Sequence, residues 1–172
     1  MTINVIKCLS QIASYLKVNP GKITLESSTA PTRSFNSTVI TGFTSIIFQF
    51  LKESNCDITG LTGAEIRQWL EYCAVYILNA DSAQSVEQIL KELNDLLSSK
   101  TYLVAFQPSI ADVTLFYCLH NIMANLSYLD KEKYLNVSRW FDNMQQDVSV
   151  RQKNKAVDFS TNYLTCVAPA RH

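Results

Sequence analysis

The segment formed by residues 110–125 is apolar on nearly every side, and this restricts what the chain can fold into. Its sequence is IADVTLFYCLHNIMAN, so a helix here has no face that suits water. Such a helix lies at the centre of a domain, where other elements cover it all round. His120, Asn121 and Asn125 interrupt the uncharged stretch, which also falls short of a membrane-spanning length. We therefore expect a helical bundle around this segment and no contact with a membrane.

A capping signal stands directly before this apolar segment. Ser109 is followed three residues later by Asp112, which is the pattern of a capping box. In this motif the serine oxygen accepts a hydrogen bond from the third helical amide, while the aspartate accepts one from the amide of the cap residue. Ser109 and Asp112 are therefore predicted to form a structural cap at which the central helix begins.

Further apolar stripes at helical spacing flank the central segment on both sides. Each stripe places apolar side chains three or four residues apart and polar ones between them, as in a helix that covers a core. The last stripe is the weakest. Together they predict helices over residues 3–17, 40–52, 66–77, 86–97, 130–146 and 150–166.

The sequence predicts little strand between these helices. Residues 22–26 alternate apolar and polar side chains and predict one short strand. Residues 27–38 are rich in Ser, Thr and Pro, and we expect them to form a loop around Pro31. Residues 53–62 contain turn-forming residues and are expected to link two parts of the chain.

The composition supports a helical protein without a nucleic-acid surface. Hydrophobic residues make up 47% of the chain and charged residues 17%, so a large core is available. Four glycines and four prolines are fewer than a sandwich with many tight turns requires. The 15 basic and 15 acidic residues give zero formal charge, and we find no basic stripe that could displace counterions from phosphates. We expect no direct binding of nucleic acid.

The cysteine pattern bears on the cellular compartment. The five cysteines, Cys8, Cys56, Cys73, Cys118 and Cys166, are scattered and contain no CxxC pair. This suits a reducing compartment better than a disulfide framework or a zinc site. Residues near the start alternate apolar and polar groups and lack the apolar core of a secretory signal. We therefore expect a cytoplasmic protein with no metal site.

The order of these elements resembles a known fold. A small part with a strand and helices, followed by a helical bundle around a Ser-x-x-Asp-capped central helix, is similar to the glutathione transferase fold. The resemblance implies a mainly α, glutathione-transferase-like protein. It further implies a truncated thioredoxin-like N-terminal lobe over residues 1–56 and an all-α C-terminal bundle over residues 63–172.

Longer strings connect the chain with one family that uses this fold. They are QWLEY at residues 68–72, SIAD at 109–112 with YCLH at 117–120, and KEKYLNVSRWF at 131–141. The sequence resembles the family of the third multifunctional auxiliary protein of the aminoacyl-tRNA synthetase complex, also called the epsilon-one subunit of elongation factor one. The similarity covers about residues 38–152, whereas the segment before it matches only in layout and the tail after Lys155 hardly at all.

This resemblance implies a scaffold without catalytic activity. Members of the family dock onto a related domain of methionyl-tRNA synthetase on one side and onto one of glutamyl-prolyl-tRNA synthetase on the other. The resemblance also implies a second location in the nucleus, linked to DNA-damage signalling.

The residues themselves argue against the transferase chemistry of this fold. A glutathione transferase needs a Tyr, Ser or Cys near its first strand for the glutathione thiolate, and an acidic-Ser pair at a helix start. Here a helix opens the chain and residues 36–38 (NST) lack the acid, although Pro31 stands where this fold keeps a cis proline. We predict no catalytic residue and no cofactor, with Cys8 and His120 in packing roles. The alternatives are a divergent glutathione-dependent transferase and a self-pairing domain that forms a homodimer when alone.

The first set of predicted partner-binding residues lies on two helices across which related domains of this fold pair. Phe43, Ile47 and Phe50, with Gln68 and Tyr72 beside them, are the candidates for the methionyl-tRNA synthetase side. The alternative for the Phe and Ile residues is that they fill the core of their own lobe.

The second set lies in the run at residues 131–141. Tyr134 and Phe141 face inward by periodicity, which leaves Arg139 outward, where a guanidinium can stack or pair across an interface. The alternative is an ordinary solvated arginine. Trp140 is also assigned to partner binding, with a place in the core as its alternative.

Overall fold

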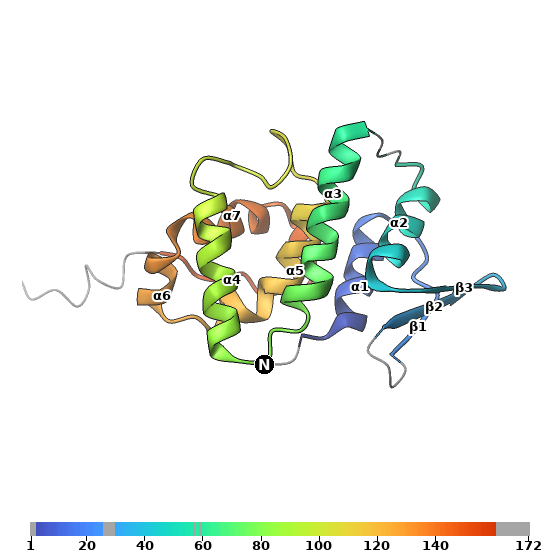
Figure 1. Cartoon of the computed structure of the whole chain (residues 1–172), viewed down its shortest axis with the longest axis horizontal. Helices are drawn as coiled ribbons and strands as arrows, with labels where there is room; N and C mark the ends of the chain where they lie inside the picture. Colours follow the sequence, from blue (N-terminus) through green and yellow to red (C-terminus); the bar gives the residue numbers. More distant parts are fainter. Residues whose placement is uncertain (1–2, 26–29, 57, 59, 161–172) are drawn as a thin grey trace, which may run out of the picture.

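The computed structural model of the 172-residue chain describes residues 3–25, 30–56, 58 and 60–160. A small sheet with helices α1 and α2 is followed by helices that pack around a central one (Figure 1). The structure is mainly α, as the sequence predicts. No helix within these ranges is long and apolar enough to span a lipid bilayer. The elements are α1 (Val5–Tyr15), β1 (Lys22–Leu25), β2 (Pro31–Phe35), β3 (Thr38–Thr41), α2 (Phe43–Glu53), α3 (Gly60–Tyr72), the π-helix η1 (Cys73–Ile77), α4 (Ala83–Leu96), α5 (Ile110–Asn125), α6 (Tyr128–Lys133), α7 (Leu135–Gln146) and α8 (Val148–Arg151).

Strands β2 and β3 occupy part of the segment that the sequence assigns to a loop. The three strands pair antiparallel in the order β1-β2-β3. Asn36 and Ser37 connect β2 with β3, both with positive φ (45° and 64°), as in a type I′ hairpin turn. The predicted loop over residues 27–38 is therefore wrong from Pro31 onward. The error arises because β2 buries Arg33 where an apolar side chain would have signalled a strand.

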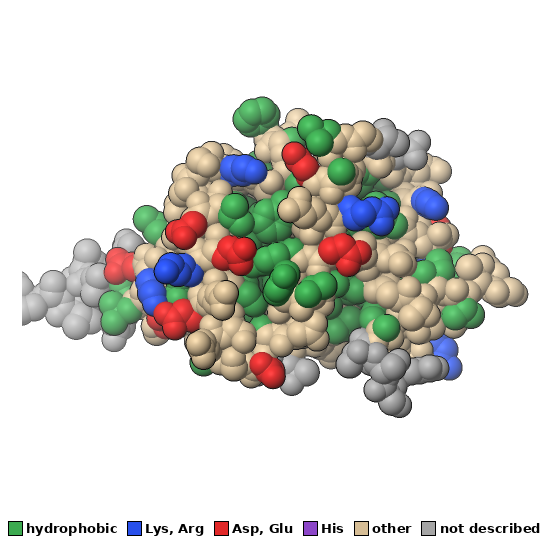
Figure 2. Space-filling model, in the orientation of Figure 1, with side chains coloured by type: hydrophobic (Ala, Val, Ile, Leu, Met, Phe, Trp, Pro, Cys, Tyr) green, Lys and Arg blue, Asp and Glu red, His purple; other side chains and the backbone are tan. Residues whose placement is uncertain are grey.

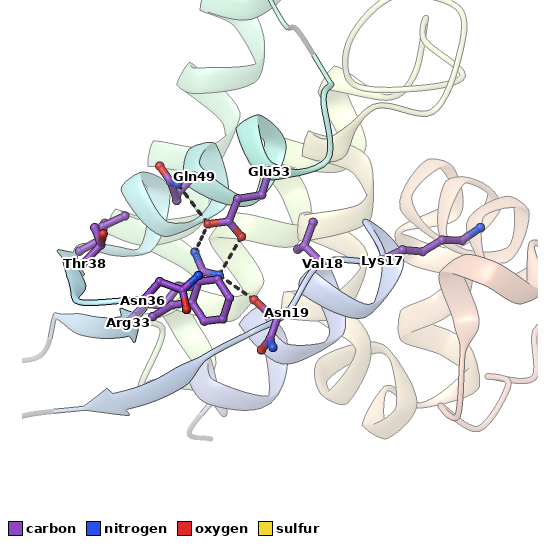
Figure 3. A pocket seen from close by; sticks show the side chains of 10 residues that line it. Lys17, Val18, Asn19, Arg33, Asn36, Thr38, Gln49 and Glu53 are labelled. Carbon is purple, nitrogen blue, oxygen red and sulfur yellow. Dashed lines mark hydrogen bonds and ion pairs between the residues drawn. The ribbon is translucent and has the colours of Figure 1, made fainter.

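Arg33 is the polar centre of the N-terminal part. Its side chain is 2% exposed, and its guanidinium donates to both carboxylate oxygens of Glu53, at 2.7 and 2.8 Å. It also donates to the backbone carbonyl of Asn19 at 2.6 Å (Figure 3) and to that of Pro20 at 3.0 Å. The hydrogen bonds from Arg33 lower the pKa of Glu53. Arg33 therefore ties β2 to the end of α2 and to the turn after α1.

Helix α5 is the buried centre that the sequence predicts. Twelve of its 16 residues are buried, and α1, α3, η1 and α7 pack around it. At its start the Ser109 Oγ accepts from the Asp112 amide at 3.5 Å, and Asp112 Oδ2 accepts from the Ser109 amide at 2.9 Å. The predicted capping box is thus present.

Asp112 also binds groups outside the first turn of α5. Its side chain is fully buried, and Oδ1 accepts from the Leu103 amide at 2.8 Å and from the Trp140 indole at 3.0 Å. The Ser109 hydroxyl donates to Oδ2 at 2.7 Å. A buried carboxylate is tolerated when hydrogen bonds replace its lost water. Asp112 therefore joins α5 to the segment before it and to α7.

The last helices differ from the prediction. The single helix expected over residues 130–146 is divided at Tyr134 (φ −107°, ψ 53°) into α6 and α7. Ser127 causes the earlier start, because its hydroxyl caps α6 by accepting from the Asp130 amide at 3.2 Å. The helix expected over residues 150–166 is also wrong in its described part, since α8 ends at Arg151 and no helix follows as far as residue 160. The rest of that predicted helix lies outside the described residues.

Candidate protein-docking surface

A cleft of 770 Å³ lies between the N-terminal part and the helices α3 and η1. Among the described residues that line it, Glu71 is the only charged one, and none is a cysteine, lysine or arginine. The first turn of α2 lines it too, and backbone amides there suit a carboxylate. The cis proline expected at Pro31 is not present, because every described peptide bond is trans. The described lining residues are Ile3, Asn4, Val5, Leu25, Ala30, Pro31, Gly42, Phe43, Thr44, Ser45, Glu71, Ala74, Leu78 and Asn79.

The apolar stripe of α2 faces the core and not a partner. Phe43 is 4% exposed, and Ile47 and Phe50 are fully buried. The stripe turns inward because α2 packs against α1, α3 and the strands β2 and β3. The assignment of these three residues to partner binding is therefore corrected, and the alternative that they fill the core holds.

A different aromatic residue of α2 reaches the surface. Phe48 is half-buried, and the guanidinium of Arg67 on α3 lies 4.1 Å from the centre of its ring. Gln68, the next residue on α3, is exposed as a docking residue must be. We call Phe48, Arg67 and Gln68 the α2–α3 face. Sequence reasoning missed Phe48, although its place off the buried stripe of α2 was the signal that could have found it.

Tyr72, the last residue of α3, contacts α4. Its ring is half-buried and its hydroxyl donates to Glu92 Oε2 at 2.9 Å. Burial and this hydrogen bond raise the pKa of Tyr72. Its neighbours are Trp69 and Tyr76, with ring centres 5.6 and 5.2 Å away. Tyr72 follows Gln68 by one turn of α3, so the two side chains share one side of that helix, and a partner contact through Tyr72 stays a prediction.

Arg139 is exposed, but its guanidinium already has partners in the chain. It donates to the backbone carbonyl of Leu97 at 2.8 Å and to that of Lys100 at 3.1 Å. Leu97 is the C-cap of α4, so the first of these hydrogen bonds stabilises the end of that helix, and the second holds the segment that follows. Trp140, by contrast, is 1% exposed and its indole donates to Asp112, so its assignment to partner binding is corrected. A partner contact through Arg139 stays a prediction.

Exposed apolar side chains stand on α6 and on α7, the helix that carries Arg139. Leu129 on α6 is 73% exposed and Leu135 at the start of α7 is 65% exposed. A hollow of 180 Å³ opens beside Leu135 and Arg139, with Phe159 from the C-terminal segment at its edge. We call Leu129, Leu135 and Arg139 the α6–α7 face. Apolar anchors beside an arginine, with charged residues around them, are typical of protein interfaces.

The remaining candidates for chemistry are three buried cysteines and the half-buried His120. Cys8, Cys73 and Cys118 are buried, and the sulfur atoms of Cys8 and Cys118 are 3.5 Å apart. The hydrogen bond with Cys118 and burial raise the pKa of Cys8, so it favours the unreactive thiol. His120 lies beside the rings of Phe116 and Phe141 and within 3.0 Å of a backbone carbonyl, and burial lowers its pKa. Within the described ranges, no group of acidic, cysteine and histidine side chains could hold a metal ion.

Solved structures with the same fold include glutathione transferases. BphK, a bacterial glutathione transferase solved as a ternary complex, superposes with a TM-score of 0.64 at 14% identity, over 88% of this chain and 94% of that one. A chain from two binary sub-complexes of the yeast aminoacyl-tRNA synthetase complex has a TM-score of 0.58 at 15% identity, over 86% of this chain and 82% of that one. At these identities the similarity shows the glutathione-transferase-like fold alone.

Sequence comparisons give the family. The family described as the nuclear-export cofactor Arc1p matches residues 62–148. A segment of the bifunctional glutamate/proline--tRNA ligase of Mus musculus is 34% identical over 106 residues, which are 61% of this chain and 7% of the ligase. The eukaryotic translation elongation factor 1 epsilon-1 of Homo sapiens is 37% identical over 133 residues, which are 75% of this chain and 76% of that protein. The chain therefore belongs to the family of eukaryotic translation elongation factor 1 epsilon-1.

Proposed function

We propose that this protein is a non-catalytic docking subunit of an aminoacyl-tRNA synthetase complex. It joins methionyl-tRNA synthetase and glutamyl-prolyl-tRNA synthetase by pairing its own fold with a related domain in each. The observation that carries the proposal is the 34% identity with one short segment of a glutamate/proline--tRNA ligase. A synthetase that contains a relative of this chain has a surface that can pair with it much as two copies of one domain pair.

The two faces described above are the proposed docking sites. The α2–α3 face, with Gln68 at its centre, takes the related domain of methionyl-tRNA synthetase. The α6–α7 face, with Arg139, takes that of glutamyl-prolyl-tRNA synthetase. Both faces carry an arginine, a residue type enriched among those that contribute most to binding energy at interfaces, beside apolar side chains on helices.

The described lining of the cleft offers little for transfer chemistry. It contains no tyrosine, lysine or arginine that could stabilise a glutathione thiolate. The proposal includes the two-part division at residues 1–56 and 63–172, a cytoplasmic location, and a nuclear one linked to DNA-damage signalling. It also includes a homodimer when the synthetases are absent.

Calorimetric titration with the isolated related domain of each synthetase tests the proposal. Gln68→Arg should weaken binding of the methionyl-tRNA synthetase domain by about tenfold, because it places a charge at the centre of an interface. Gln84→Arg is the matched control, since Gln84 is also exposed but lies at the start of α4, outside both faces. Equal weakening by both variants would refute the assignment of this face.

A glutathione titration beside these measurements separates the alternatives. Heat with the synthetase domains and none with glutathione supports the docking subunit. Heat with glutathione alone would support the divergent transferase, for which the α2 amides in the cleft would supply the carboxylate site. A stable homodimer that ignores both synthetase domains would support the self-pairing domain.

A further inference from the structure

A groove between η1 and α4 is lined by none of the residues that define the two docking faces. It has a volume of 520 Å³, and Figure 2 shows hydrophobic side chains gathered in the middle of the surface over α3 and α4, with acidic side chains on both sides. One wall comes from the end of α3 and from η1, and the other from α4. The groove is lined by Tyr72, Val75, Tyr76, Asn79, Ser85, Gln88, Ile89 and Glu92.

The π-helix explains why apolar side chains stand exposed here. Such a turn holds one residue more than an α-helical turn and is frequent at functional sites. The Asn79 amide stabilises it by donating to the carbonyls of Ala74 at 3.0 Å and of Val75 at 2.9 Å. Cys73 and Ile77 remain buried, while Val75 and Tyr76 are 55% and 59% exposed. The backbone is therefore fixed in a form that presents an aliphatic and an aromatic side chain to solvent.

The chemistry of the groove suits a cation. The rings of Tyr72 and Tyr76 lie 5.2 Å apart, and the hydroxyl of Tyr72 holds the carboxylate of Glu92 beside them. An aromatic face attracts a cation, and a carboxylate pairs with it. None of the described residues that line the groove is a lysine or an arginine, so no cation of the groove itself occupies this place.

A second tyrosine–glutamate pair on the surface shows the contrast. On α6 the hydroxyl of Tyr128 donates to Glu132 Oε1 at 3.1 Å, much as Tyr72 does to Glu92. There, however, Lys131 and Arg139 line the same hollow and supply positive charge. In the groove beside η1, by contrast, Glu92 has no lysine or arginine among the described lining residues, so a cation from a partner can pair with it.

We infer that the groove between η1 and α4 binds an arginine side chain of a partner protein, with the guanidinium on the Tyr76 ring and against the Glu92 carboxylate. Arginine fits better than lysine, because a planar guanidinium can stack on a ring and pair with a carboxylate at once. The inference goes beyond the synthetase docking proposed above and does not depend on it.

Binding of a designed helical peptide to the whole chain tests this inference. The probe is an alanine-based peptide with three arginines at four-residue spacing, and its control replaces each arginine by the neutral isostere citrulline. We expect the arginine peptide to bind and the citrulline peptide not to, and a lysine version to bind more weakly. Equal binding of the arginine and citrulline peptides, or no binding of either, would overturn the inference.

Variants locate the binding site. Tyr76→Leu and Glu92→Gln should each weaken the arginine peptide about fivefold, the size expected for a cation–π contact or an exposed ion pair. The matched controls are Phe106→Leu, at an aromatic residue that is 95% exposed, and Glu132→Gln in the second tyrosine–glutamate pair. Losses in the controls as large as in the groove variants would place the peptide elsewhere and overturn the inference. Because no synthetase takes part, this result is independent of the docking experiments.

Discussion

Arg33 and Asp112 are both buried charged side chains, yet they hold their parts of the protein in different ways. Arg33 is paired with an opposite charge, Glu53, and with two backbone carbonyls. Asp112 has no ion partner among its hydrogen bonds, which come from the neutral groups of Ser109, Leu103 and Trp140. An ion pair therefore stabilises the N-terminal part, whereas the bundle is stabilised by a carboxylate that accepts hydrogen bonds from neutral donors.

The difference extends to the two docking faces. Glu53 ends α2, so the Arg33–Glu53 pair supports the α2–α3 face. Trp140 lies beside Arg139 on α7, so Asp112 supports the α6–α7 face. Replacing Arg33 should therefore disturb the α2–α3 face more, and replacing Asp112 the α6–α7 face. The two parts of the protein should also lose stability differently with pH.

The largest expected effect is that of Asp112→Ala. It removes the cap of α5 and leaves the Trp140 indole and the Leu103 amide buried without an acceptor, so the free energy of unfolding should fall by about 3–5 kcal/mol. Urea denaturation measures it. Ser109→Ala is the control, because it removes the capping hydroxyl but leaves the acceptor, and should cost about 1 kcal/mol. Equal losses from the two variants would show that Asp112 only caps α5.

Arg33→Met should cost somewhat less, about 2–4 kcal/mol, because it leaves Glu53 and two backbone carbonyls without their donor. The loss is smaller than for Asp112 since the Glu53 side chain is 25% exposed and keeps some contact with water. Urea denaturation of Arg33→Met, Glu53→Gln and the double variant gives the coupling between them. A coupling near zero would show that the ion pair contributes nothing to the N-terminal part.

The ion pair should also make part of the stability depend on pH. The hydrogen bond from Arg33 lowers the pKa of Glu53 in the folded protein, so the contribution is present above the ordinary glutamate pKa of about 4.3 and is lost as the pH falls through the lowered pKa. The difference in unfolding free energy between the natural chain and Glu53→Gln should therefore shrink between neutral pH and about pH 3. A constant difference would contradict the pairing.

The smallest expected effect on stability is that of Arg139→Ala. The exposed arginine binds carbonyls at the end of α4, so its loss should lower the free energy of unfolding by about 0.5–1.5 kcal/mol. Binding of the glutamyl-prolyl-tRNA synthetase domain should fall by about tenfold, whereas binding of the methionyl-tRNA synthetase domain should not change. Arg139→Lys separates charge from geometry, since lysine keeps the charge but not the planar donor group.

The same two residues show how far the sequence predicts this structure. The cap made by Asp112 could be predicted because its partner Ser109 stands three residues away. The Trp140 contact of Asp112 could not, because 28 residues separate the two and no spacing rule joins them. The sequence does not predict strand β2 for the same reason, because Arg33 is buried there with a partner, Glu53, that is 20 residues away.

The docking residues show the limit of periodicity. An apolar stripe at helical spacing indicates which side of α2 is apolar, but not whether the core or a partner covers it. Periodicity therefore leaves both places open for Phe43, Ile47 and Phe50, and the structure buries all three. Exposed positions such as Gln68 and Arg139 follow from the same periodicity, whereas the exposure of Tyr76 depends on a π-helix that the sequence does not announce.

The proposed docking subunit binds two synthetases at once, through two separate faces. The most direct measurement is a calorimetric titration of this chain with the related domain of glutamyl-prolyl-tRNA synthetase, first alone and then after saturation with the N-terminal domain of methionyl-tRNA synthetase. Two independent faces predict saturable binding with the same affinity in both titrations. Loss of binding after saturation would mean that the partners compete for one face, and would contradict the proposed role of a subunit that joins them.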